Sequence, residues 1–172
     1  MGPPLAVRIP LAAAPGVNRP TRLDLTDESV ARAVLEVQRA AYAVEAQLIG
    51  SDGIPALTET LDELLAAGEE WLGVHDEDGL AGAVSWRELD DGTIDIHRLV
   101  VAPRAFRRGV ASALLDGLDE TYPGRSMIVS TGSANEPALT LYRRRGFDVV
   151  GEREVVPGLS ITGLARRRPA GG

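Results

Sequence analysis

A short basic segment with small residues is the part of the chain whose residue types point most directly to chemistry. It reads Arg107-Arg108-Gly109-Val110-Ala111-Ser112 and follows an apolar strand-like run that ends before Pro103. After Gly109 the apolar residues recur with helical spacing. The unpaired N–H groups and the positive dipole end of a helix start attract phosphate, and Gly109 and Ala111 let the backbone approach a ligand closely. The segment predicts a phosphate-binding loop, with an ordinary strand-to-helix turn as the alternative.

A second segment, in the C-terminal part of the chain, combines a polar helix start with a tyrosine. It runs from Asn135 through Pro137 and Tyr142 to Gly146 and Phe147. Proline suits the first position of a helix, and glycine suits the position just past its end, where φ is often positive. The spacing predicts a short helix with Asn135 at its start and Tyr142 about two turns further on.

Together these two segments resemble the GNAT superfamily of N-acetyltransferases. The first is similar to the loop that holds the pyrophosphate of acetyl-CoA. The second is similar to the family's Asn-x-x-Ala-x-x-Leu-Tyr-x-x-x-Gly-Phe motif, and the resemblance is specific from Asp95 to Phe147. It implies direct transfer of an acetyl group from acetyl-CoA, as cosubstrate, to a primary amine in a ternary complex. A non-catalytic acyl-CoA-binding regulatory module is the alternative function.

The resemblance also assigns roles to individual residues. Tyr142 matches the general acid that protonates the departing CoA thiolate, and the strand ending at Val101 matches one that splays from its neighbour. Phe106 departs from the family pattern, which often has Gln or Arg there. Because backbone N–H groups do most of the phosphate binding, we expect this departure to weaken the match to the family only a little. The residues matched to acetyl-CoA binding are Leu99, Val100, Val101, Arg107, Arg108, Gly109, Val110, Ala111, Ser112 and Asn135.

The motifs do not identify the group that takes the proton from the acceptor amine. An alkyl ammonium has a pKa of about 10, so it must lose a proton before its nitrogen can attack. His97 has a suitable ordinary pKa, although a lone strand histidine is more often structural. Asp95 is a second candidate on the same strand. Glu45 interrupts an apolar helix face, and it either anchors and deprotonates the amine or lies in solvent at the edge of that face.

Composition limits the classes of function. The 172 residues fit one domain, and the absence of cysteine excludes disulfides and a thiol nucleophile. With only two histidines and no cysteine, the usual zinc spacings are missing and no metal site is predicted. The absence of lysine excludes a P-loop, which needs one.

Charge and hydropathy narrow the partners and the location. A net charge of −7 argues against nucleic acid as a partner and is compatible with a cationic acceptor, either a small molecule or a peptide amine. We expect no membrane association, because no apolar run is long enough to span a bilayer. The N-terminus lacks the basic start of a signal peptide, so a cytoplasmic location is the default expectation. Whether the chain forms a homodimer is left open.

The remaining pattern predicts the elements that position these residues. Residues 1–20 form an irregular lead-in, 21–165 a single N-acetyltransferase domain, and 166–172 a disordered tail. Strands followed by a β-α-β-α order predict an α/β fold with one mixed, mostly antiparallel sheet and helices on both faces. The expected helices cover residues 28–49, 57–67, 110–118 and 137–145. The expected strands cover residues 21–25, 70–74, 80–86, 92–101, 127–130, 148–153 and 159–165.

Overall fold

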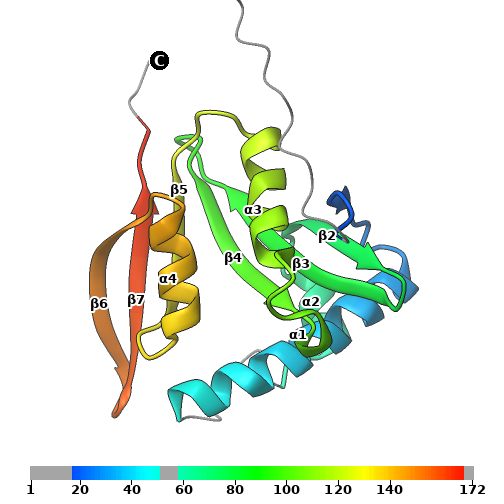
Figure 1. The fold of residues 1–172 in the computed structure, drawn as a ribbon, viewed down its shortest axis with the longest axis horizontal. Helices are drawn as coiled ribbons and strands as arrows, with labels where there is room; N and C mark the ends of the chain where they lie inside the picture. The colour runs from blue at the N-terminus through cyan, green and yellow to red at the C-terminus, as the bar shows by residue number, and fades with distance from the viewer. Residues whose placement is uncertain (1–16, 51–57, 169–172) are drawn as a thin grey trace, which may run out of the picture.

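The computed structural model describes residues 17–50 and 58–168. They form a seven-stranded sheet in the order β1-β2-β3-β4-β5-β7-β6 (Figure 1). Neighbouring strands pair antiparallel except β4 and β5, which are parallel, so the predicted mixed and mostly antiparallel sheet is confirmed. The strands are β1 (Thr21–Arg22), β2 (Glu70–Asp76), β3 (Gly79–Glu88), β4 (Ile94–Val101), β5 (Met127–Gly132), β6 (Asp148–Val156) and β7 (Leu159–Arg166).

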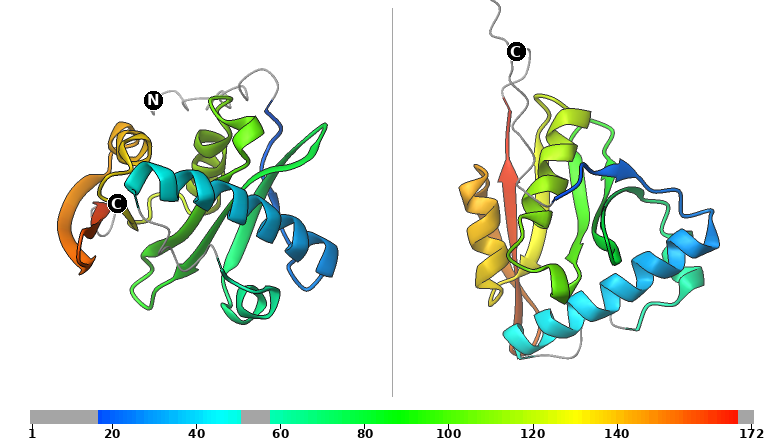
Figure 2. Two further views of the ribbon diagram at one scale, coloured as in Figure 1. Left: turned by 90° about the horizontal axis from the view of Figure 1, so that it is seen from below. Right: turned by 45° about the vertical axis from the view of Figure 1, so that its right-hand side comes forward.

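Helices cover both faces of the sheet, as the sequence predicts. They are α1 (Glu28–Ile49), α2 (Leu61–Ala66), α3 (Val110–Thr121) and α4 (Glu136–Arg144), with a short 3₁₀ turn, η2, at Pro103–Ala105. Figure 2 shows α3 and α4 on one side and α2 on the other, with α1 crossing one end of the sheet. In the described ranges, no helix has both the length and the apolar character needed to cross a membrane.

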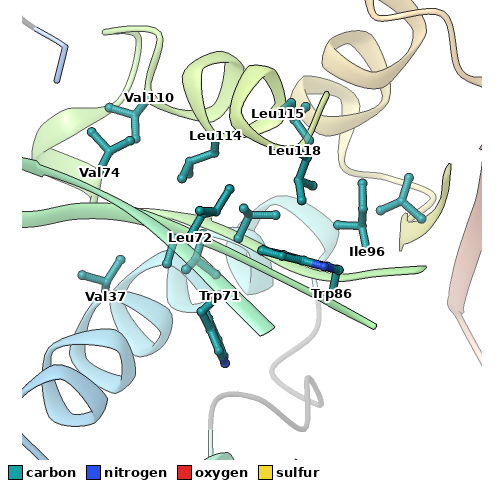
Figure 3. Close-up of a cluster of buried hydrophobic side chains, with 14 of the residues drawn as sticks. Val37, Trp71, Leu72, Val74, Trp86, Ile96, Val110, Leu114, Leu115 and Leu118 are labelled. Atoms are coloured by element: carbon teal, nitrogen blue, oxygen red, sulfur yellow. The ribbon is translucent and has the colours of Figure 1, made fainter. Parts of the chain in front are cut away.

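The hydrophobic core lies on both sides of the central strands. Figure 3 shows Leu114 and Leu118 of α3 above the strands, and Val37 of α1 and Trp71 of β2 below them. All four side chains are buried, and burying a side chain of this size is worth about 1.5–3 kcal/mol. This packing fixes α3 and α1 against opposite faces of the same strands.

A glycine in β3 sets how closely α3 approaches the sheet. A Cβ at Gly82 would lie 2.7 Å from Val110 Cγ1 and 2.9 Å from the carbonyl oxygen of Val100. Only a residue without a side chain leaves room for the first turn of α3 at this distance. The start of α3 therefore rests directly on β3 and β4.

Several predicted element boundaries differ from the structure by a few residues, and two of these differences have local causes. The second helix begins at Leu61, because the Thr60 side chain caps it by accepting a hydrogen bond from the Glu63 N–H at 3.2 Å. The first strand stops at Arg22 instead of residue 25, since Asp24 forms a turn by accepting from the Thr26 N–H at 2.9 Å.

The start of the predicted tail is also wrong. Arg166 is the last residue of β7, and its guanidinium forms an ion pair with Asp119 of α3. The N–H of Arg168 donates to Ser126 Oγ at 2.9 Å. These partners hold Arg166 and Arg168 against the rest of the domain. Residues 169–172 of the predicted tail and residues 1–16 of the predicted lead-in lie outside the described residues.

The two central strands separate along their length. β4 and β5 pair only where Ile94–Ile96 meets Met127–Val129. Past these residues both strands continue without pairing to each other, and Figure 1 shows β4 turning away from β5 toward α1. This divergence exposes backbone groups of both strands to a shared space, as the family resemblance implies.

Candidate active site

A cleft of about 900 Å³ occupies the space where β4 and β5 diverge. It is lined by α1, β4, the loop that leads into α3, β5 and α4. The structure therefore brings nearly all of the predicted site residues into one cavity. Those that line it are Glu45, His97, Leu99, Val100, Val101, Arg107, Gly109, Val110, Ala111, Ser112, Asn135 and Tyr142.

Arg108 is the predicted binding residue that does not line the cleft. Its charge lies near Asp76 on the neighbouring hairpin, where it contributes to lowering the pKa of that carboxyl, after the larger effect of Arg104. The sequence gives Arg107 and Arg108 the same weight. The turn points them in different directions, so only Arg107 stays with the cavity.

The loop before α3 has the backbone conformation of an anion site. Arg107 has φ +63° and Gly109 has φ +81°, and left-handed residues of this kind turn successive N–H groups toward one concavity. In the described part of the chain, no side chain caps the start of α3, so its first N–H groups remain available to a ligand. These features fit the pyrophosphate of acetyl-CoA.

Tyr142 lies at the other end of the cleft, on the second turn of α4. Its ring is 3% exposed and packs edge-to-face on Phe147, with the ring centroids 5.4 Å apart. Burial raises the pKa of the phenol above its ordinary value of 10, and nearby Tyr42 and Glu45 raise it further. The hydroxyl therefore stays protonated at any ordinary pH and can donate a hydrogen bond into the cleft.

Asn135 connects the start of α4 to the opposite wall of the cleft. Its Oδ1 accepts a hydrogen bond from the Ala138 N–H at 3.2 Å, which caps the helix. Hydrogen bonds from the Asn135 side chain and from the Gly132 backbone favour the charged form of Glu45. The asparagine of the motif thus positions both α4 and a carboxylate of α1.

Glu45 is half-buried and faces the cleft, so its predicted alternative position in solvent at the edge of α1 is wrong. The sequence could not decide this, because the outcome depends on α1 crossing the open end of the diverging strands. Burial raises the pKa of the Glu45 carboxyl, and this effect exceeds the opposing effect of its hydrogen bonds. A carboxylate held here attracts a cation and can accept a proton.

A β-bulge determines where His97 points. Ser85 pairs with Arg98 and Trp86 pairs with Ile96, so His97 is the extra residue of β4. Its ring nitrogens lie 3.2 Å from Asp95 Oδ2 and 3.6 Å from Glu69 Oε1. His97 consequently lines the cleft beside two carboxylates.

Sequence reasoning missed two residues of the cleft wall that α1 and β4 form. Tyr42 lies about one helical turn before Glu45 and lines the cleft beside it, and that helical spacing could have identified it. Arg98 lines the cleft as well, and it forms ion pairs with Glu59 at 2.7 Å and Glu69 at 3.0 Å. An arginine inside an apolar strand was a signal of a buried partner, but these partners lie far away in sequence.

Two relatives share substantial identity with the chain. UPF0157 protein YqkA of Bacillus subtilis (strain 168) is 35% identical over 137 residues, which cover 79% of this chain and 40% of YqkA. Peptidyl-lysine N-acetyltransferase YiaC of Escherichia coli (strain K12) is 34% identical over 90 residues, which cover 52% of this chain and 56% of YiaC. The match thus spans less than two thirds of the length of either relative.

Solved structures share the fold. The ribosomal-protein-S18-alanine N-acetyltransferase of Escherichia coli has a TM-score of 0.70 at 16% identity, over 89% of this chain and 95% of that one. An aminoglycoside 6′-N-acetyltransferase complexed with coenzyme A has a TM-score of 0.68 at 14% identity, over 88% of this chain and 99% of that one. At these identities the likeness shows the fold alone.

The family profile extends over most of the chain. The profile described as the acetyltransferase (GNAT) family matches residues 34–147, a range that includes the loop before α3, the diverging strands and the α4 motif. Enzymes of this family use acetyl-CoA as cosubstrate, in agreement with the sequence-based expectation. The chain belongs to the acetyltransferase (GNAT) family.

Proposed function

We propose that the chain transfers the acetyl group of acetyl-CoA to a cationic primary amine. The observation that carries this proposal is one continuous cleft that joins an anion-binding loop to Tyr142 and Glu45. Acetyl-CoA supplies the acetyl group as a thioester, so a carbon–nitrogen bond forms, the carbon–sulfur bond breaks, and CoA leaves as the thiol. The use of acetyl-CoA is consistent with a cytoplasmic location.

The loop before α3 binds the phosphates. The first N–H groups of α3 and the left-handed turn at Arg107 and Gly109 hold the pyrophosphate, and the Arg107 side chain adds positive charge. The edge of β4 from Leu99 to Val101 has no pairing to β5, so its backbone groups can bind the pantetheine arm. The acetyl group then reaches the part of the cleft between Tyr142 and Glu45.

Glu45 receives the acceptor. Its carboxylate attracts the ammonium group, which loses one proton to solvent before its nitrogen attacks. A carboxylate oxygen of Glu45 then takes the second proton once the carbon–nitrogen bond has formed. An alkyl ammonium has a pKa of about 10, well above that of a carboxyl, so Glu45 takes the second proton, which the new bond to carbon has made much more acidic. The raised pKa of Glu45 reduces this mismatch. His97 beside Asp95 is the second candidate for the same role.

Tyr142 supplies the proton for the leaving group. Its phenolic O–H donates to the sulfur as the carbon–sulfur bond breaks. The ammonium loses two protons in the whole reaction, of which one ends on the CoA thiol and the other leaves to solvent. Because a thiolate leaves fairly well without protonation, we expect the contribution of Tyr142 to lie at the low end for general acids, about 10²-fold.

The acceptor is proposed as a small-molecule or peptide amine. A relative, YiaC, is named for peptidyl-lysine, and a lysine side chain is a primary alkyl amine of the kind that Glu45 would attract. The surplus of acidic residues, with a net charge of −7, is compatible with a cationic acceptor.

The substitution Tyr142→Phe tests the catalytic part of this proposal. With cadaverine as acceptor, we expect kcat for CoA release to fall about 10²-fold while the Kd for acetyl-CoA stays unchanged, since only a hydroxyl is lost. Tyr122→Phe is the matched control. Its hydroxyl accepts from Trp86 Nε1 at 3.1 Å and donates to Glu70 Oε2 at 2.9 Å, and it does not line the cleft. Equal kcat in the parent and in Tyr142→Phe would remove this residue from the mechanism.

A further inference from the structure

The acceptor side of the cleft contains an arginine whose N–H groups are all in use. Arg98 Nε donates to Glu69 Oε1 at 3.0 Å. One terminal nitrogen donates to Gln38 Oε1 at 2.8 Å and to Glu59 Oε2 at 2.7 Å. The other donates to Glu59 Oε1 and Glu69 Oε2, both at 3.0 Å. A guanidinium has five N–H donors, and each of them has a partner here.

This network carries surplus negative charge. Two carboxylates face one guanidinium, and the Glu59 and Glu69 side chains are only 12% and 2% exposed, so water screens them weakly. Asp95 adds a third carboxylate next to His97. Glu45 adds a fourth from α1. Arg39, an exposed residue of α1, donates to the Glu59 backbone oxygen at 3.2 Å and offsets part of this charge from the solvent side. In the described part of the chain, the other arginines that line the cleft lie in the loop before α3, on α4 and at its C-terminal cap.

Arg98 is therefore unable to bind the carboxylate of a ligand, although an arginine at this place would be suited to it. An arginine in an amine-binding cleft would ordinarily bind the carboxylate of an amino acid through two parallel hydrogen bonds. To do so here, Arg98 would have to give up donors that already bind Glu59 or Glu69. An incoming carboxylate at Arg98 would also be repelled by Glu59 and Glu69, which lie against its guanidinium outside the lining of the cleft.

We infer that the acceptor end selects primary amines that carry no carboxylate near the reacting nitrogen. Diamines, polyamines and lysine side chains within a peptide belong to this class, and free amino acids are rejected. The inference rests on the proposed function, because it describes the acceptor of that same reaction. Arg98 acts as a specificity residue, because the negative charge of its two carboxylate partners exceeds its own positive charge.

Matched pairs of amines test the selection in the parent protein. Agmatine and arginine differ only by a carboxylate, as do histamine and histidine, and each of the four has a single alkyl amine, which lies near the carboxylate where one is present. With saturating acetyl-CoA, we expect kcat/KM to favour the carboxylate-free member of each pair by about tenfold or more, mainly through KM, as one surplus charge at short range implies. Calorimetric titration of agmatine and arginine into the protein with CoA should give the same order of affinity.

The substitution Glu59→Gln tests whether the network causes the selection. It keeps the side-chain shape and leaves one carboxylate for one guanidinium, so we expect the preference within each pair to shrink several-fold. Glu36→Gln is the matched control, because Glu36 is an exposed residue of α1 that carries the same charge and forms none of the hydrogen bonds to Arg98. It should leave the ratio unchanged.

Two results would overturn the inference. Equal kcat/KM and equal affinity within the pairs would show that a carboxylate is tolerated. A ratio that stays the same in a folded Glu59→Gln protein would show that another feature makes the selection. If that variant does not fold, the parent ratios decide alone. Absence of turnover with every amine would contradict the proposed function instead, and the calorimetric order would then decide the inference.

Discussion

Glu45 illustrates at the residue scale how a functional group costs stability. Burial in the cleft raises its pKa in the folded protein above the ordinary value of 4.5. The folded state therefore holds this proton more tightly than the unfolded state. Protonated Glu45 contributes to the stability of the fold at a pH below its ordinary pKa, and this contribution is lost as the pH rises through the raised pKa. At neutral pH the ionised, half-buried side chain therefore lowers the free energy of unfolding.

We predict that Glu45→Gln raises Tm at pH 7 and lowers turnover. The amide cannot ionise, so the variant should lack the part of the decline in Tm that the parent shows as the pH rises from 4.5 upward. Thermal melts over this pH range and kcat with cadaverine measure the two effects. A lower Tm at pH 7 together with unchanged kcat would return Glu45 to a structural role. Glu36→Gln controls for the change in net charge.

Sequence reasoning at this scale succeeds where a motif is local. Asn135 and Tyr142 belong to one short segment, and the structure places both at the cleft. Arg98 was not predicted as a site residue because its partners Glu59 and Glu69 lie 39 and 29 residues away in the chain. Contacts of that kind arise from the fold and leave little trace in local spacing.

The start of α3 shows how one element is prepared for a ligand. Gly82 lets its first turn rest on β3, and the left-handed residues Arg107 and Gly109 direct the preceding backbone. These features are typical of a rigid anion site, because the N–H groups are already oriented before the ligand binds.

Replacing Gly109 by valine should abolish the rise in Tm that acetyl-CoA causes. A ligand that binds only the folded state stabilises it by mass action, so lost binding removes the rise. Gly124→Val is the matched control. Gly124 has φ +73° with nothing within 4 Å of a Cβ, so the variant bears a similar backbone strain, about 1–2 kcal/mol, at a position that does not line the cleft. An undiminished rise in a folded Gly109→Val protein would show that the phosphate site lies elsewhere.

A helix start was more predictable than strand details where a capping residue directly precedes the apolar pattern. Asp27 caps α1 by accepting a hydrogen bond from the Ser29 N–H at 2.9 Å, as its position before the apolar pattern predicts. The bulge that adds His97 to β4 was not predicted, because it depends on the register between two strands. The early end of the β4–β5 pairing was implied only by the resemblance to the family, since both strands continue as apolar runs.

At the scale of the whole molecule, charge is divided across the cleft. The chain has a net charge of −7, yet Arg107 and Arg144 face the cavity from the loop before α3 and from α4. The wall built from α1 and β4 holds Glu45 and the surplus charge of the Arg98 network. This division suits an anionic cosubstrate on one side and a cationic acceptor on the other. The net charge of the sequence predicted only that the acceptor is a cation. That the positive and negative residues line different walls of the cleft could be seen only in the structure.

The most direct test of the account is the joint release of CoA thiol and formation of an acetylated amine. The protein is incubated with acetyl-CoA and cadaverine. The concentration of CoA thiol is measured over time, and the mass of the amine product is determined by mass spectrometry. We predict that thiol appears only when the amine is present and that each thiol matches one acetyl group gained by cadaverine. An acetyl-CoA-dependent rise in Tm without thiol release for cadaverine, putrescine, spermidine or a lysine peptide would contradict the account and favour a regulatory acyl-CoA-binding module.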